Sequence, residues 1–212
     1  MSKAQILNRV RSALDKNHIV KFEPCFKDIL KSEYQDLLEE YKHFQTINRA
    51  KVIESCTQNL KTDVLKAFED MGAKKVLYAL DLPFEATQLD GKFEKIAYDK
   101  SIEAIRSELF QIDTSILQGV CGVANLGIVG IVSSPLSPRL ASLITLNCVI
   151  LLDKTKIVKN LFEGVQALKA RAKDGVLPTN LLFIAGPSRT ADIELQTVFG
   201  VHGPQNVTII LY

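Results

Sequence analysis

From Lys51 to Tyr212 the chain alternates short apolar runs with amphipathic segments, and this alternation is the feature that most constrains its fold. The runs have the length of strands, and several are apolar over most of their length. Such strands are buried on both faces, as they are in parallel sheets that helices cover. We therefore predict an α/β fold in three layers, with a mostly parallel sheet and helices on both faces. The predicted strands are KKVLYAL, EKIAYD, TSILQGV, GIVGIVSS, CVILLD, NLLFIAG and NVTIILY, and KVIESC is either a further strand or a helix.

Three helices are predicted between these strands, because the intervening segments repeat apolar residues at helical spacing. Thr57 is placed to cap the first of them, and Gly72 follows it as a glycine that ends a helix. The second covers residues 101–110, and the third covers residues 158–172.

The first 48 residues are predicted to form a helical extension ahead of an α/β domain over residues 49–212. Two apolar stripes at helical spacing indicate two helices, joined by an extended linker in which Pro24 breaks the pattern. We expect the extension to pack on its own domain, and the alternative is that it reaches a partner. The stripes are Ile6, Val10, Ala13 and Leu14, then Tyr34, Leu37, Leu38, Tyr41 and Phe44.

Composition excludes several classes of protein. The net charge of +2 is too small to indicate binding to nucleic acid or to an anionic membrane. The longest apolar run, LASLITLNCVILL, is shorter than the ~20 residues of a membrane span. The N-terminus lacks the apolar block of a signal peptide, so the expected location is the cytoplasm. The four cysteines and three histidines are scattered, so no metal or other cofactor is expected in this chain.

The stretch GPSRTADIELQTVFGVHGP, residues 186–204, is the strongest candidate for a ligand site. We predict that it follows a strand of the parallel sheet and opens a helix that carries Ile193, Leu195 and Val198. Hydroxyls near the free N–H groups of a helix start, together with an arginine, can hold a phosphate or a carboxylate. The same residues also suit an ordinary helix start, with two acids in its first turn. The candidates are Ser188, Arg189, Thr190, Asp192 and Glu194.

Ser188, Asp192 and His202 also contain the residue types of a hydrolase triad. The GxSxG elbow on which such a serine usually lies is absent, and spacing alone does not bring His202 to Ser188. The alternative is that His202 lies in a turn between Gly200 and Gly203.

Two upstream segments add candidates. The glycine-rich stretch GVCGVANLGIVG matches neither GxGxxG nor the P-loop, and glycines in strands often mark bulges or close backbone contacts. Downstream of it, SSPLSPRL ends near Arg139, which either pairs with a carboxylate or binds an anionic ligand.

GPSRTADIE, followed by GVHGP and a closing strand, resembles the signature of the lactate utilisation protein C family, the LUD domain. The resemblance extends loosely back to about residue 112. It implies a fold like that of the ribose-5-phosphate isomerase, coenzyme A-transferase and formyltetrahydrofolate cyclo-ligase group. It also implies two iron–sulfur partner proteins in the oxidation of L-lactate to pyruvate, with the clusters in those partners.

The resemblance has one departure in its upstream loop. Many family members carry Ala, an acidic residue and Thr-Gly-Thr there, where this chain has Ala124, Asn125, Leu126, Gly127 and Ile128. Compared with those members, this loop lacks one charge and two hydroxyls that could contact a ligand, although its backbone N–H donors remain. Asn125 and Gly127 stay candidate ligand-binding residues.

Three functions follow as hypotheses. The first is a subunit of an L-lactate utilisation system that acts with iron–sulfur proteins and binds a small carboxylate or a phosphate-bearing ligand. The alternative is a stand-alone enzyme of the related fold group, acting on a phosphorylated sugar, a coenzyme A ester or a folate, with Asp192, Glu194 or His202 as acid or base. The third is a binding module without catalysis, which an exposed apolar patch on the N-terminal helices would favour.

Overall fold

The computed structural model describes residues 2–17, 34–100, 102–191 and 196–212, and the chain divides into two units, Met1–Lys31 and Ser32–Tyr212. The first unit holds α1 (Lys3–Lys16), which confirms the first predicted helix. Ser2 and Gln5 begin α1 with a reciprocal capping box, and its apolar residues are exposed. The predicted linker around Pro24 lies outside the described residues.

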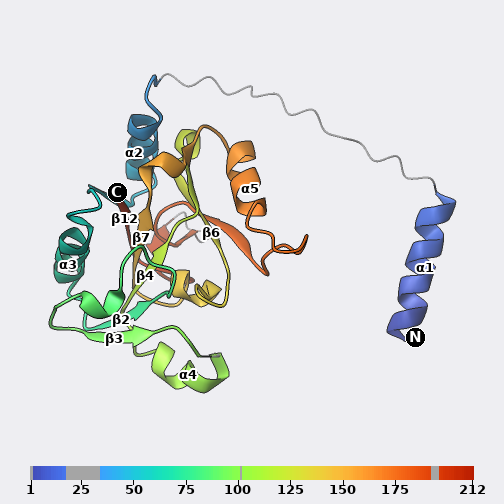
Figure 1. Cartoon of the computed structure of the whole chain (residues 1–212), viewed down its shortest axis with the longest axis horizontal. Coiled ribbons are helices and arrows are strands. Elements are labelled where there is room, and N and C mark those ends of the chain that lie inside the picture. The colour runs from blue at the N-terminus through green and yellow to red at the C-terminus, as the bar shows by residue number, and fades with distance from the viewer. Residues whose placement is uncertain (1, 18–33, 101, 192–195) are drawn as a thin grey trace. The chain divides into compact units, whose positions relative to one another are not determined.

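The second unit is built on a six-stranded sheet whose strands are all parallel, in the order β1-β12-β7-β4-β2-β3 (Figure 1). This sheet, the main sheet, confirms the α/β prediction, and KVIESC contributes its strand β1. Every residue of the central strand β7 is buried, as expected for a strand with both faces covered. The bounds are β1 Lys51–Glu54, β2 Lys75–Tyr78, β3 Glu94–Ala97, β4 Thr114–Gln118, β7 Asn147–Leu152 and β12 Asn206–Leu211.

Helices cover both faces of the main sheet. On one face α3 (Leu60–Met71) packs Val64 and Phe68 against β7 Val149 and Leu151. On the other face α4 (Ile102–Leu109) shares a core with the alternate residues of the same strands. Gly72 ends α3 at φ +65°, as predicted, but Thr57 does not cap it, because α3 begins after Asn59.

A second sheet, in the order β8-β5-β6-β9, covers part of the same face of the main sheet as α4. The sequence pattern did not predict this second sheet. β6 pairs antiparallel with β5 and with β9, so the predicted strands GIVGIVSS and NLLFIAG lie outside the parallel sheet. The reason is the short turn η2 (Ala124–Leu126), after which Gly127 at φ +54° reverses the chain. The bounds are β5 Cys121–Val123, β6 Ile128–Val132, β8 Ile157–Val158 and β9 Leu181–Ile184.

α5 (Leu161–Lys169) packs on the second sheet, and Figure 1 shows α3 and α5 on opposite sides of the main sheet. It is shorter than the helix predicted over 158–172, because the Asn160 side chain caps it and Val158 belongs to β8. Gly164 allows α5 to pack closely on β5 of the second sheet, since an added Cβ would lie 2.6 Å from Val123 Cγ2. No helix among the described residues has both the length and the apolar character needed to cross a membrane.

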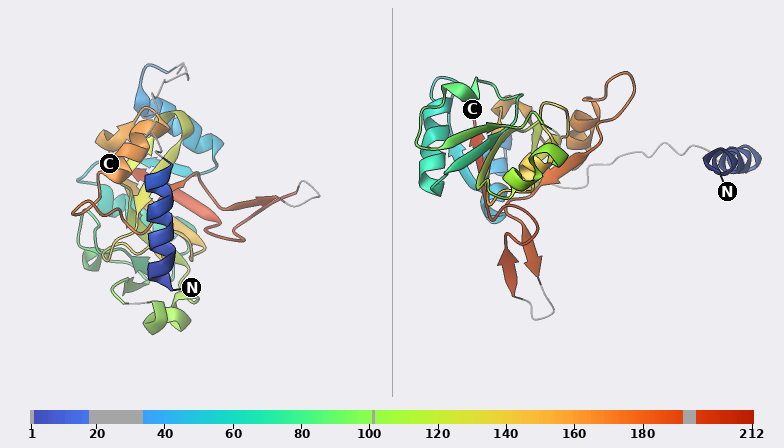
Figure 2. Two further views of the ribbon diagram at one scale, coloured as in Figure 1. Left: turned by 90° about the vertical axis from the view of Figure 1, so that its right-hand side faces the viewer. Right: turned by 90° about the horizontal axis from the view of Figure 1, so that it is seen from below.

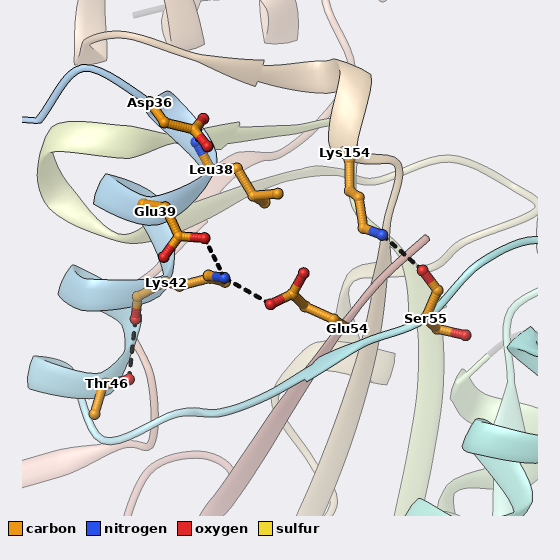
Figure 3. Close-up of polar contacts among 8 residues, drawn as sticks. All are labelled: Asp36, Leu38, Glu39, Lys42, Thr46, Glu54, Ser55 and Lys154. Atoms are coloured by element: carbon orange, nitrogen blue, oxygen red, sulfur yellow. Dashed lines mark hydrogen bonds and ion pairs between the residues drawn. The ribbon is translucent and has the colours of Figure 1, made fainter.

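The helical extension predicted over residues 1–48 is divided between the units, because α2 (Leu37–Ile47) packs into the second. Tyr41 is fully buried there, and its hydroxyl accepts a hydrogen bond of 2.7 Å from Gln45. Lys42 links α2 to the end of β1 through Glu54, at 2.6 Å (Figure 3). The second helix of the prediction is therefore part of the α/β unit.

Candidate functional site

The stretch from Gly186 to Pro204 forms a β-hairpin instead of the predicted helix start. β10 (Arg189–Ala191) pairs antiparallel with β11 (Thr197–Phe199), and the two strands extend away from both sheets (Figure 2). Val198, predicted on a helix, lies in β11, and within the described part of this stretch no helix begins beside Ser188 or Thr190. Asp192, Ile193, Glu194 and Leu195 lie outside the described residues. The helix was wrong because periodicity over so short a stretch fits either element, and β-branched residues on both sides favour strands.

The glycines and prolines of this stretch build the base of the hairpin. Gly186 has φ +72°, and an added Cβ would lie 2.1 Å from the backbone oxygen of Asn48 at the end of α2. The Ser188 amide donates to Pro204 O at 2.8 Å, and the Gly200 amide donates to Ser188 O at 3.0 Å. The close packing of the hairpin base against the end of α2 therefore explains much of the sequence signature in residues 186–204.

The polar side chains near this base are not joined into a catalytic unit. Among the described residues, no hydrogen bond links the Ser188 hydroxyl to the His202 ring, and His202 is exposed in the turn that leads to Pro204. The Arg189 guanidinium donates to the backbone oxygen of Ala185 at 3.1 Å. A role for these residues in ligand binding remains a prediction.

Asn125 and Gly127 lie in the turn that packs against α2. An added Cβ at Gly127 would lie 2.3 Å from the carbonyl carbon of Phe44. The Asn48 side chain donates to Leu126 O and Gly127 O, at 2.8 Å each. The Asn125 Oδ1 atom is buried without a partner, but neither Asn125 nor Gly127 lines the cleft described next.

A cleft of about 950 Å³ lies at the carboxyl edge of the main sheet, where ligands bind in open parallel sheets. We call it the β2–β4 cleft. Asp81 follows β2, Tyr98 follows β3 and Gln118 ends β4, and all three line it. Arg139, predicted from sequence, lines the cleft from η3 (Arg139–Ser142). Arg171, from the segment after α5, lines it as well.

Cations outnumber acids around this cleft. Arg139, Arg171, Lys100 and Lys173 line it, against the carboxylates of Asp81 and Asp99, which leaves two more positive than negative groups. A cleft with one prevailing sign of charge concentrates ligands of the opposite sign. The side chains therefore favour an anion.

The Asp81 carboxyl has a raised pKa. The chief cause is desolvation in the cleft, although the residue as a whole is exposed. Its own backbone amide, the Arg171 guanidinium and the Ser137 hydroxyl each act to lower the pKa. Asp81 is thus more easily protonated than an ordinary aspartate and stands beside a cation, as an acid or base in a binding cleft requires.

Two polar atoms in the wall of the cleft are buried without a hydrogen-bond partner. Tyr98 is 1% exposed, and neither its hydroxyl nor Gln118 Oε1 is bonded within the described structure. Burial raises the pKa of the Tyr98 hydroxyl, with Arg139 acting against the rise, so the hydroxyl remains a donor at neutral pH. Buried polar groups are normally satisfied, so these two atoms stand out, although both are closed off from the open cleft by the atoms around them.

The amino edge of the main sheet is different, because its polar groups bond to one another. The Asp113 carboxylate accepts hydrogen bonds from the backbone amides of Lys74 and Lys75. The Asn147 side chain donates to the Thr114 hydroxyl and accepts from the Asn206 side chain. A smaller pocket of about 530 Å³ lies at this edge, but Lys51 there pairs with Asp70 at 2.7 Å. Arg49 in the same pocket stacks on Phe199, 5.3 Å from the ring centre. The carboxyl edge is therefore the better candidate site.

The cysteines form no ligand cluster in the part of the chain that is described. No group of three or more His, Cys, Asp or Glu residues there is placed to hold a metal ion. Burial raises the pKa of the Cys121 thiol to about 11 and of the Cys148 thiol to about 12, so both are neutral thiols at physiological pH. Cys56 is half-buried, and Cys25 lies outside the described residues.

Sequence reasoning found Arg139 but missed most of the other residues of the cleft. A signal was present for Asp81, Tyr98 and Gln118, since each stands at the end of a predicted strand. The rule that ligands bind beyond carboxyl ends was applied instead to the strand before Gly186, which belongs to the second sheet and pairs antiparallel with β6. Arg171 gave no such signal, because its segment folds over the cleft from after α5.

Comparison with known proteins gives one family. The model of the LUD domain matches residues 7–212. An uncharacterized protein of Neisseria meningitidis is 32% identical over 181 residues, which cover 82% of this chain and 77% of that protein. A lactate utilization protein C of Macrococcus caseolyticus is 26% identical, with coverage of 90% and 84%. The protein of that name from Bacillus subtilis is 32% identical over 145 residues, with coverage of 68% and 58%.

A solved structure has the same fold. The crystal structure of a DUF162 family protein from Deinococcus radiodurans matches with a TM-score of 0.63 and covers 82% of this chain and 95% of that one. Its sequence is 19% identical, so the likeness concerns the fold alone.

Proposed function

Because the chain belongs to the LUD-domain family, we propose that it is a subunit of an L-lactate utilisation system and binds a small carboxylate or a phosphate-bearing ligand in the β2–β4 cleft. Relatives named lactate utilization protein C support the role in lactate utilisation. The observation that carries the binding site is the convergence of four cationic side chains, Arg139, Arg171, Lys100 and Lys173, on one cleft at the carboxyl edge of the sheet.

In this proposal each group of the cleft has a role that follows from its chemistry. Arg139 and Arg171 bind the anionic group, since a guanidinium offers paired donors to carboxylate or phosphate oxygens. Lys100 and Lys173 add positive charge around the same cleft. Asp81 takes up or releases a proton at the mouth of the cleft.

The oxidation itself is assigned to iron–sulfur partner proteins, as the family resemblance implies. The electrons that leave lactate need an acceptor, and the described thiols of this chain are dispersed, two of them buried and neutral. The contribution of this subunit is then to bind the ligand and to assemble with the partners. No membrane or nucleic acid takes part in this proposal.

One observation favours a second candidate, a stand-alone enzyme acting on a phosphorylated sugar, a coenzyme A ester or a folate. Asp81 has a raised pKa and lines a binding cleft beside the Arg171 guanidinium, an environment in which general acids and bases are found. Turnover of such a substrate by the purified chain, lost in Asp81→Asn, would support this candidate over the first.

We expect deletion of the gene in its native cells to abolish growth on L-lactate and to leave growth on pyruvate intact. The reason is that pyruvate enters metabolism after the oxidation step. A tagged copy should restore growth and co-purify with iron–sulfur proteins, detected by their visible absorption and by mass spectrometry. Unchanged growth on L-lactate after deletion would contradict the proposed role.

A further inference from the structure

We infer that the ligand of the β2–β4 cleft is an anion with an apolar body, considerably larger than lactate. The inference rests on the proposed anion site and narrows its ligand from any small carboxylate or phosphate-bearing molecule to a larger anion with an apolar body. It follows from the size of the cleft, the composition of its walls and the position of its polar groups.

The cleft is too large for lactate. Its volume is about 950 Å³, at the upper end of the roughly 300–1,000 Å³ found for sites of drug-sized ligands. A water molecule takes about 30 Å³ in the liquid, so lactate, with its handful of non-hydrogen atoms, needs less than about 200 Å³. Lactate alone would leave most of the cleft to water.

Apolar side chains cover much of the wall. Val120, just before β5, and Val132, at the end of β6, are both half-buried. Leu136 and Leu177 lie on two different loops and are exposed. Apolar side chains that gather around a concave surface gain free energy when an apolar ligand displaces water from them. The walls therefore suit a hydrocarbon or ring system.

The polar groups provide the other part of the recognition. Arg139 and Arg171 line the cleft together with Lys100 and Lys173, so its cationic side chains can hold a charged group. The apolar side chains that line the same cleft then contact the body of the ligand. An alkyl or aryl carboxylate and an organic phosphate both satisfy this pattern.

A homologous series tests the inference. Acetate, butanoate, hexanoate, octanoate and the matching alkyl phosphates would be titrated calorimetrically into the full chain, beside L-lactate and inorganic phosphate at fixed ionic strength. We expect the affinity to rise about fourfold per methylene until the alkyl chain fills the cleft, which corresponds to ~0.8 kcal/mol for each buried CH₂. Whether the phosphates or the carboxylates bind more tightly identifies the charged group.

The variant Val120→Thr/Val132→Thr keeps the shape of the wall but adds two hydroxyls. It should weaken octanoate binding about five- to tenfold and leave L-lactate binding unchanged, with the unfolding transition as a check on folding. An affinity that is flat along the series, or highest for L-lactate, would overturn the inference while the anion site stands. Failure of every anion to bind would overturn the proposed anion site as well.

Discussion

Replacement of Gly186 by alanine is expected to destabilise the protein by about 2–5 kcal/mol. Gly186 has φ +72°, where a side chain costs roughly 1–2 kcal/mol. In addition, the new Cβ would lie 2.1 Å from Asn48 O, so the hairpin base and the end of α2 would have to separate, at a cost of about 1–3 kcal/mol. Urea unfolding followed by circular dichroism measures the loss.

Gly175 provides a matched control, because it has φ +73° and nothing lies within 4 Å of an added Cβ. Gly175→Ala should therefore cost only the backbone part, about 1–2 kcal/mol. The difference between the two variants isolates the contact with Asn48. Equal losses would show that the base of the hairpin is loosely packed and that the glycine of the signature serves something other than this close packing.

Arg139→Gln is expected to weaken the binding of hexanoate and of inorganic phosphate about 10–100-fold. A hydrogen bond to a charged group is worth about 1.5–3 kcal/mol, and glutamine keeps part of the length of arginine without its charge. Arg189→Gln should bind both anions as the unmodified chain does, because Arg189 lies on the hairpin and donates to Ala185 O. Isothermal titration provides the affinities.

Arg106→Gln serves as the control for net charge, since Arg106 is exposed on α4 and does not line the cleft. Its effect should stay within about twofold, as expected for a distant surface charge that salt screens. The opposite pattern, with weak binding in Arg189→Gln and normal binding in Arg139→Gln, would move the ligand to the hairpin and restore the site predicted from sequence.

The strands and helices around the main sheet could be predicted because their patterns are local. CVILLD and NVTIILY are mostly apolar and supply β7 and β12, in which all or all but one of the residues are buried. Gly72 ends α3 with a φ of +65°. The assignment of strands to sheets could not be predicted. NLLFIAG looks like any buried strand. Only its antiparallel pairing with β6 places it in the second sheet, and the paired residues Val132 and Leu181 are 49 residues apart in the chain.

The candidate site was harder to predict for the same reason. The signature is dense in polar residues and glycines, which drew attention to the hairpin, whereas the cleft collects one or two residues from each of several distant segments. Tyr98 is a clear case, because a tyrosine after a strand gives no sign that its hydroxyl will be buried without a partner. These segments meet at one cleft because of the order of the strands in the main sheet, and a local sequence pattern holds no information about strand order.

Growth on L-lactate of a deletion strain that carries Arg139→Gln is the most direct test of the β2–β4 cleft as the working site of this subunit. We predict that the unmodified gene and the Arg189→Gln gene both restore growth. The Arg139→Gln gene should fail to restore it, although the variant accumulates to the same level and unfolds at the same urea concentration. Full growth with Arg139→Gln would contradict the assignment of the ligand to this cleft.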